Sequence, residues 1–213
     1  MSAGHKKALI YLRKDLILRK IIKEYQIEEL DGVSDLFQDL IESIINQQLS
    51  GKAAATIFGR FKNLFKTKTF PLSQDILKIS DDKIRSCGIS YSKIKYIKGI
   101  CQAIIDGSLN VKKISTLSDE EVIIELTKLN GVGQWTAEMI LIFSLGRQDV
   151  FSTGDLGLRT AVSKLYKREF ESSAYNVDRE DIKRIEKISK RWSPYRSLAA
   201  RLLWRSLDNR SKI

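Results

Sequence analysis

The chain has 213 residues, which is enough for one sizeable domain or two small subdomains with cores of their own. It carries 37 Lys and Arg against 26 Asp and Glu, so its formal net charge is +11. This excess favours an anionic partner, with nucleic acid first, although a merely soluble basic protein would show it too.

The two cysteines, Cys87 and Cys101, cannot supply a four-thiolate iron–sulfur cluster or a Cys-rich zinc site. The single histidine, His5, lies near the N-terminus, so zinc catalysis and His-based acid–base chemistry are not expected. Two cysteines at this length also argue against a disulfide scaffold and for a reducing setting. Because the sequence has neither a run of ~18–20 apolar residues nor a signal-peptide pattern, we expect no membrane attachment and no secretion.

Apolar residues recur at helical spacing along nearly the whole chain, and strand-like alternation is scarce. The sequence therefore predicts an all-α fold of about ten helices with short connections. Their expected ranges are 15–28, from a cap at Ser34 or Asp35 to about 48, 51–66, a short helix after Ser73, 81–88, 91–106, 119–128, 134–146, 155–168, 179–190 and 194–207. Ser118 and Glu121 form a capping-box pattern at one helix start, and the polar segment 170–179 is expected to be a mobile loop.

The most informative segment is Leu129-Asn130-Gly131-Val132-Gly133-Gln134-Trp135-Thr136-Ala137, in which two glycines join two predicted helices. Glycine permits a positive φ and a close approach of another backbone. The second helix would present unpaired N–H groups and the positive end of its dipole, which can bind a phosphate without reading base sequence. A bare G-x-G is explained equally well by a tight turn between helices, so the flanking residues must decide.

A second segment, Asp149-Val150-Phe151-Ser152-Thr153-Gly154-Asp155-Leu156-Gly157-Leu158-Arg159, stands downstream. Together the two resemble the helix-hairpin-helix (HhH-GPD) DNA glycosylases, in which an L-x-G-V-G-x-x-T-A hairpin precedes a catalytic aspartate by about twenty residues. The segments Asn46–Ala54 (NQQLSGKAA) and Trp192–Ala199 (WSPYRSLA) resemble one branch, the alkylpurine glycosylases of the 3-methyladenine glycosylase II type. The resemblance covers roughly residues 30–208, and the extra N-terminal β-domain of some bacterial members has no room here.

The resemblance implies two helical subdomains with a DNA-binding helix-hairpin-helix and an active cleft between them. We expect residues 36–147 to form the central subdomain with wedge and hairpin, and residues 1–35 and 148–213 to form the other. The expected partner is duplex DNA with alkylated bases or abasic sites, bound by a monomer in the nucleus of a eukaryote or the cytoplasmic nucleoid otherwise. No metal or cofactor is implied, except a monovalent cation that the hairpin carbonyls of Leu129 and Val132 could hold.

Asp155 matches the family's catalytic aspartate, which would stabilise an oxocarbenium-like sugar and orient or deprotonate the attacking water. An Asp at a helix start is also an ordinary N-cap, and both roles can coexist. Trp135 stands where bifunctional members carry a nucleophilic lysine, so the resemblance implies a monofunctional enzyme without a lyase step. Its indole would attract a cationic alkylpurine, although a tryptophan at this spacing is also common in a core. Trp204 matches a second pocket tryptophan, and Met139, one turn after Trp135, completes the expected base pocket.

A glycosylase extrudes its target base, and a wedge fills the gap in the stack. Gln48 matches the intercalating residue, or it only caps the carboxyl end of its helix. Leu49 lies beside it, and Ser50 and Lys52 would face the minor groove or a phosphate. The hairpin positions that match phosphate-binding residues of the family are Gly131, Gly133 and Thr136. Weaker candidate phosphate contacts are Lys93, Lys95 and Arg159.

Some positions depart from the family's pattern. Ser152 stands where relatives commonly carry Pro, which should loosen the loop before Asp155, and Met139 and Ser50 replace larger side chains. Three functions therefore stay open. The first is a monofunctional glycosylase that removes 3-methyladenine and 7-methylguanine. The second is a glycosylase-like protein that binds abasic or alkylated DNA with little or no excision, and the third is a nonspecific hairpin-type DNA-binding module.

Overall fold

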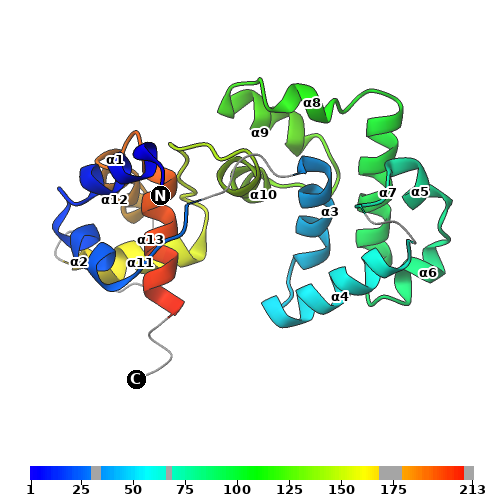
Figure 1. The fold of residues 1–213 in the computed structure, drawn as a ribbon, viewed down its shortest axis with the longest axis horizontal. Coiled ribbons are helices and arrows are strands. Elements are labelled where there is room, and N and C mark those ends of the chain that lie inside the picture. The colour runs from blue at the N-terminus through cyan, green and yellow to red at the C-terminus, as the bar shows by residue number, and fades with distance from the viewer. Residues whose placement is uncertain (30–34, 66–68, 168–178, 209–213) are drawn as a thin grey trace. The chain divides into compact units, whose positions relative to one another are not determined.

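A computed structural model describes residues 1–29, 35–65, 69–167 and 179–208, and within these ranges it contains helices and no strand, as expected (Figure 1). The segment 170–179, predicted as a loop, lies outside the described residues except for Arg179. The helices in chain order are α1 (Ala3–Leu12), α2 (Leu16–Glu24), α3 (Leu36–Asn46), α4 (Gly51–Asn63), α5 (Ser73–Lys78), α6 (Asp81–Arg85), α7 (Tyr91–Ile105), α8 (Val111–Ile114), α9 (Asp119–Thr127), α10 (Gln134–Met139), the π-helix η1 (Ile140–Ser144), α11 (Leu156–Leu165), α12 (Arg179–Lys190) and α13 (Arg196–Asp208).

The first predicted helix, 15–28, begins as predicted, with Asp15 as the N-cap of α2, but α2 already ends at Glu24. The prediction also misses α1, which precedes α2. The break falls at Asp15, whose Oδ1 accepts the N–H groups of Ile17 and Leu18 at 2.8 and 3.0 Å. Because a carboxylate that binds these free donors starts a new helix, Asp15 caps α2 and does not continue α1.

The helix predicted at 134–146 also differs, because it is α-helical only to Met139. The following turn is a π-helix, in which the Leu145 N–H donates to the carbonyl of Ile140, five residues back, at 2.9 Å. The prediction further misses α8, whose four residues are too few for a periodic signal.

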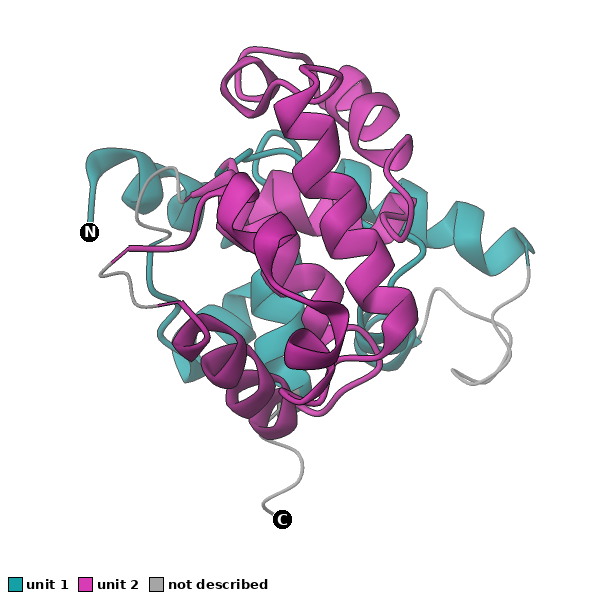
Figure 2. Cartoon of the chain, turned by 90° about the vertical axis from the view of Figure 1, so that its right-hand side faces the viewer, with its two compact units in different colours: residues 1–31, 146–213 teal, residues 32–145 magenta. Residues whose placement is uncertain are grey.

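The chain forms two compact units, drawn in different colours in Figure 2: unit 1 comprises residues 1–31 and 146–213, and unit 2 comprises residues 32–145. The sequence analysis places both boundaries a few residues later, after 35 and after 147. The active cleft expected between subdomains stays a prediction, and each unit is described by itself below.

Helix α7 forms the centre of unit 2, where α3, α5 and α6 pack against it. Its buried residues Ile94, Ile97, Ile100 and Cys101 follow one face at helical spacing. Burial raises the pKa of the Cys101 thiol to about 12, and both cysteines are free, so neither takes part in a disulfide.

Trp192 is the largest side chain buried in unit 1, with 1% of its surface exposed. Its ring packs against Phe151 and Tyr166, with centroid distances of 5.5 and 6.0 Å, and its Nε1–H donates to Asp15 Oδ2 at 3.2 Å. This one residue therefore joins the start of α2 to α11 and to the segment before it.

An ion pair fastens that segment to α13. Asp149 accepts hydrogen bonds from Arg196 Nε and from Ser193 Oγ, each at 2.8 Å. Burial works against the charge of Asp149, but the bonds from Arg196 and Ser193 outweigh it and hold the pKa of the carboxyl below its usual value. No helix in the described part of the chain is long and apolar enough to cross a membrane.

Candidate active site

The hairpin of unit 2 connects α9 to α10 through a tight turn. The predicted capping box starts α9: the Ser118 N–H donates to Glu121 Oε2 at 2.8 Å, and the Glu121 N–H donates to Ser118 Oγ at 3.2 Å. After α9, the Val132 N–H donates to the Leu129 carbonyl at 3.0 Å, and Gly131 takes a φ of +87° at the third position of this turn. This φ is typical of a type II turn and favours glycine.

Packing also restricts position 131. A Cβ built on Gly131 would lie 2.4 Å from Cδ2 of Tyr96, which is closer than side-chain atoms approach one another. Gly133 differs, because it has a φ of −92° and nothing within 4 Å of a Cβ. The two glycines of the motif therefore have different roles. Position 131 needs glycine because of its positive φ and its packing against Tyr96, whereas glycine at position 133 leaves open space at the start of α10.

A hydrogen bond ties the hairpin to the loop that carries the candidate wedge. Gln47, the C-cap residue that follows α3, donates from Nε2 to the carbonyl of Gly131 at 2.8 Å. The same loop is held by Lys93 of α7, whose Nζ donates to the carbonyls of Ile45 and Gln47 at 2.8 and 2.7 Å. Lys93 and Tyr96 lie one turn apart on α7, so one helix supports both the wedge loop and the hairpin.

These contacts correct the role predicted for Lys93. Its ammonium caps carbonyls at the negative end of α3, where a cation is favoured, and so it is not available as a phosphate contact in this conformation. Partial burial lowers the pKa of Lys93. Lys95, two residues further on, is exposed and stays a candidate phosphate contact.

The candidate wedge residues protrude from unit 2. Gln48 and Ser50 are exposed, and Leu49 exposes 37% of its surface. Gln48 has a φ of +58°, a left-handed conformation that ends a helix and that glycine or asparagine adopts more easily. Lys52 lies in the first turn of α4. Together with Ser50 and with Arg60, which lies in the last turn of the same helix, Lys52 lines a hollow of about 420 Å³.

The expected base pocket includes an exposed apolar row on α10 and η1. Trp135 exposes 47% of its surface, and Met139 follows one turn later and is half-buried. Phe143, which the sequence analysis misses, is a third member and is 43% exposed. Its spacing of four residues from Met139 could have revealed it. Thr136 is 4% exposed, so its side chain cannot reach a phosphate. Of the predicted contact, only a hydrogen bond from the backbone N–H of Thr136 is still possible.

The candidate catalytic carboxylate lies in unit 1 at the start of α11. Asp155 Oδ1 accepts the N–H of Leu158 at 2.7 Å, so the N-cap reading of this residue is correct. The same oxygen accepts the indole Nε1–H of Trp204 at 2.9 Å, a contact that the prediction of a pocket tryptophan does not foresee. The structure therefore unites two predicted site residues, Asp155 and Trp204, through one hydrogen bond.

Gly157 makes this contact possible. A Cβ at position 157 would lie 3.1 Å from Asp155 Oδ1 and 3.2 Å from Cδ1 of Trp204, which is tighter than ordinary packing. Ser152 is fully buried, and its carbonyl accepts the Asp155 N–H at 3.2 Å. Arg159 is half-buried one turn after Asp155.

Among the side chains that the structure describes, no three His, Cys, Asp or Glu gather in a group that could hold a metal ion. The monovalent cation at the hairpin stays a prediction. Leu129 O already accepts the Val132 N–H, but a carbonyl has a second lone pair that a cation could use.

Comparison with known proteins gives matches over most of the chain. Residues 41–193 match the model of the HhH-GPD superfamily base excision DNA repair proteins. The chain is 34% identical over 191 residues to DNA-3-methyladenine glycosylase 1 of Schizosaccharomyces pombe, covering 89% of this chain and 80% of that protein. Among solved structures, the 3-methyladenine DNA glycosylase of the same yeast in complex with abasic DNA matches with a TM-score of 0.79 and 33% identity, over 95% of this chain and 97% of that one. A DNA-3-methyladenine glycosidase from Bacillus halodurans matches with a TM-score of 0.78 and 33% identity, over 95% and 89%.

The two hairpin glycines should respond differently to alanine. Gly131→Ala should destabilise the protein by about 2–4 kcal/mol, because the methyl group meets Tyr96 and the left-handed φ disfavours alanine. Gly133→Ala should leave the thermal unfolding midpoint unchanged and weaken binding to duplex DNA, because its methyl group would stand where a phosphate approaches the α10 N–H groups. Thermal unfolding and DNA titration measure both effects. Equal stability of the two variants would contradict the different roles given to Gly131 and Gly133.

Lys93 and Lys95 form a matched pair for separating a structural role from a phosphate contact. Lys93→Met should lower the free energy of unfolding by about 1–3 kcal/mol, since two carbonyls lose a charged donor. The slope of log affinity against log salt concentration should stay unchanged. Lys95→Met should leave unfolding unchanged, and it should reduce that slope by about one if Lys95 contacts a phosphate. A reduced slope with unchanged stability for Lys93→Met would restore Lys93 as a DNA contact.

Proposed function

Because the chain belongs to the HhH-GPD superfamily of base excision DNA repair proteins, we propose that it is a monofunctional DNA-3-methyladenine glycosylase. It hydrolyses the N-glycosidic bond of alkylated purines, such as 3-methyladenine and 7-methylguanine, in duplex DNA and leaves an abasic site. Its substrate is therefore found wherever the cell keeps its DNA, in a nucleus or a nucleoid. The observation that carries the proposal is the position of Asp155, an anchored carboxylate at the family's catalytic position.

Asp155 is suited to stabilise a developing positive charge. Cleavage of the N-glycosidic bond builds charge on the sugar, and a fixed anion nearby lowers the energy of that state. The hydrogen bonds from Leu158 and Trp204 to Oδ1 keep the carboxylate in place before the substrate arrives, so little reorganisation is needed during the reaction. In the proposed mechanism, the carboxylate also orients or deprotonates the water that attacks C1′ of the sugar.

The sequence of α10 supports hydrolysis without a lyase step. A bifunctional enzyme needs an amine that forms a Schiff base with the sugar, and α10 contains no lysine, with Trp135 at the position concerned. The exposed indole of Trp135 offers a π-face to a base that alkylation has made cationic, an attraction of about 1–2 kcal/mol when water is excluded. Met139 and Phe143 extend this apolar row and add contact area without a polar group to satisfy.

The residues proposed to bind the DNA backbone and to fill the stack lie in unit 2. The start of α10 binds a phosphate, while Gln48 and Leu49 fill the gap that the extruded base leaves. Because Gln47 and Lys93 join the wedge loop to the hairpin, the proposed phosphate-binding site and the wedge keep a fixed spacing. A fixed spacing matters because the wedge must enter the stack at a set distance from the bound phosphate.

Asp155→Asn tests the proposal without removing the helix cap. The asparagine carbonyl oxygen still accepts the N–H groups of Leu158 and Trp204, so folding should be preserved, while the anion is lost. Single-turnover release of 3-methyladenine should fall by at least about 100-fold, and affinity for abasic DNA should persist. The measurement is base release from methylated duplex DNA with the enzyme in excess.

The chain offers a matched control in Asp15. It also caps a helix and accepts an indole N–H, that of Trp192, so Asp15→Asn makes the same chemical change away from the proposed reaction. This control should release base at the wild-type rate. Equal rates for wild type and Asp155→Asn would refute the catalytic role, and no release by the wild type would identify a protein that only binds damaged DNA.

The left-handed conformation of Gln48 allows a test of the wedge in which stability and activity move in opposite directions. Gln48→Gly should raise the free energy of unfolding by about 1 kcal/mol, because glycine tolerates a φ of +58°. It should also slow single-turnover excision about tenfold, because nothing then fills the gap in the stack. Gln48→Ala should slow excision similarly with no gain in stability. If both variants excise at the wild-type rate, Gln48 only ends α3 and does not act as the wedge.

A further inference from the structure

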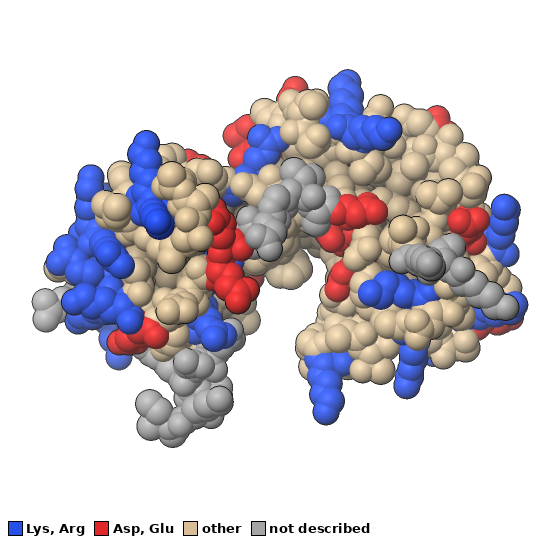
Figure 3. Space-filling model, in the orientation of Figure 1, with Lys and Arg blue, Asp and Glu red and all other residues tan. Residues whose placement is uncertain are grey.

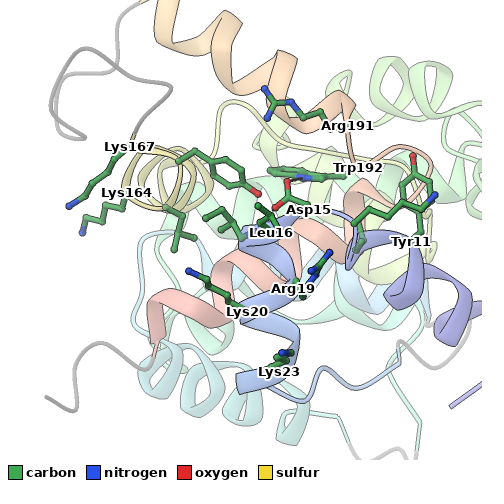
Figure 4. A pocket seen from close by; sticks show the side chains of 15 residues that line it. Tyr11, Asp15, Leu16, Arg19, Lys20, Lys23, Lys164, Lys167, Arg191 and Trp192 are labelled. Carbon is green, nitrogen blue, oxygen red and sulfur yellow. Dashed lines mark hydrogen bonds between the residues drawn. The ribbon is translucent and has the colours of Figure 1, made fainter.

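Unit 1 contains a basic hollow that none of the proposed roles uses (Figure 4). Its volume is about 1050 Å³, and it is lined by the end of α1, the first turns of α2, the end of α11 and the residues that follow α12. Seven of the described residues that line it are basic: Lys14, Arg19, Lys20, Lys23, Lys164, Lys167 and Arg191. Figure 3 shows that blue Lys and Arg side chains gather over this part of unit 1.

Among the described residues that line the hollow, the only carboxylate is already engaged. Asp15 binds the N–H groups of Ile17 and Leu18 and the indole N–H of Trp192, so it serves the α2 cap and the core. Lys14, Lys20, Lys23 and Lys167 are all exposed. The hollow therefore presents a concentrated positive charge to solvent, and such a surface attracts polyanions.

The hollow is separate from the candidate catalytic carboxylate. Asp155 caps the N-terminus of α11, whereas Lys164 lies in its last turn, nine residues further on. At 1.5 Å per residue these ends are about 13 Å apart along the helix. The basic side chains are therefore not the ones that would hold the sugar at Asp155.

We propose that this hollow binds the phosphate backbone of a second DNA duplex segment, so that one protein molecule bridges two segments. Figure 4 shows two groups of lysines along the hollow, Lys20 and Lys23 on α2, and Lys164 near the end of α11 with Lys167 just after that helix. Two groups of cations along a hollow can follow a continuous row of phosphates and need no base contact. The site would therefore take duplex DNA of any sequence, damaged or not.

Two other polyanions fit the hollow less well. Single-stranded nucleic acid needs an aromatic face for stacking, but Trp192 is 1% exposed, and Tyr11 is covered by the ammonium of Lys14 at 5.0 Å and packed edge-on against Tyr195. An acidic amphipathic helix needs several apolar anchor points. Among the described lining residues, Leu16 is the one large apolar side chain that is markedly exposed, whereas Leu12 is buried.

Bridging has a physical advantage for a protein that searches DNA for rare lesions. A protein held by a second segment can pass from one duplex to another without returning to bulk solution. The inference goes beyond the excision reaction and requires only that the protein binds DNA. Its failure would therefore leave the proposed glycosylase activity untouched.

The test compares two double variants with equal charge changes. Lys20→Glu/Lys23→Glu alters α2 at the hollow, and Lys112→Glu/Lys113→Glu alters α8 in unit 2. The probe is a pair of lesion-free duplexes, one with a donor and one with an acceptor fluorophore, with the protein-to-duplex ratio determined by sedimentation. Wild type and the α8 variant should give energy transfer in complexes of one protein with two duplexes. The α2 variant should bind the second duplex at least about tenfold more weakly.

The remaining readouts decide between the proposal and its rivals. The α2 variant should excise 3-methyladenine from a short duplex within about twofold of the wild-type rate, and the salt slope for the second duplex should fall by about two. Undiminished bridging by the α2 variant would overturn the proposal. A parallel loss of excision would also overturn the proposal, because Lys20 and Lys23 would then contact the duplex that carries the lesion. Competition by a Glu-rich peptide, without any binding of a second duplex, would assign the hollow to an acidic protein segment.

Discussion

The hydrogen bonds that Lys93 donates at the carboxyl end of α3 are the contacts on which the proposed DNA-binding part of unit 2 depends. The loop after α3 must expose Gln48 and Leu49 while its own backbone carbonyls remain satisfied. Lys93 meets this need from α7, and Gln47 then reaches the carbonyl of Gly131. Since Tyr96 of the same helix packs on Gly131, the wedge loop and the hairpin share one rigid support.

Unit 1 uses one local device twice, with different results. Asp15 and Asp155 each cap a helix and each accept an indole N–H, from Trp192 and Trp204 respectively. At Asp15 the tryptophan is 1% exposed and the arrangement serves the core. At Asp155 both partners are only half-buried, so the same arrangement leaves a carboxylate within reach of a ligand. The exposure of the tryptophan partner, and not the hydrogen-bond pattern, distinguishes the structural Asp15 from the proposed catalytic Asp155.

The sequence was sufficient for features that depend on neighbours along the chain. The periodicity of Ile94, Ile97 and Ile100, the capping box at Ser118 and the cap at Asp155 are local patterns, and the structure contains all of them. The role of Lys93 could not be predicted, because its carbonyl partners lie 46 and 48 residues away and no spacing rule connects them. The same holds for the bond between Trp204 and Asp155, which joins residues 49 apart.

The π-helix η1 has a consequence for the apolar row on α10. A π turn contains one residue more than the α turn that it replaces, so it marks a place where chain length can change by one without a break in the helix. Because the extra residue is taken up within that one turn, its loss would restore α-helical hydrogen bonding while the side chains beyond the turn keep their direction relative to Trp135. Phe143 lies inside the turn, so its place relative to Met139 is what would change. The shape of this apolar row, the proposed base-contacting surface, is therefore adjustable by insertion or deletion as well as by substitution.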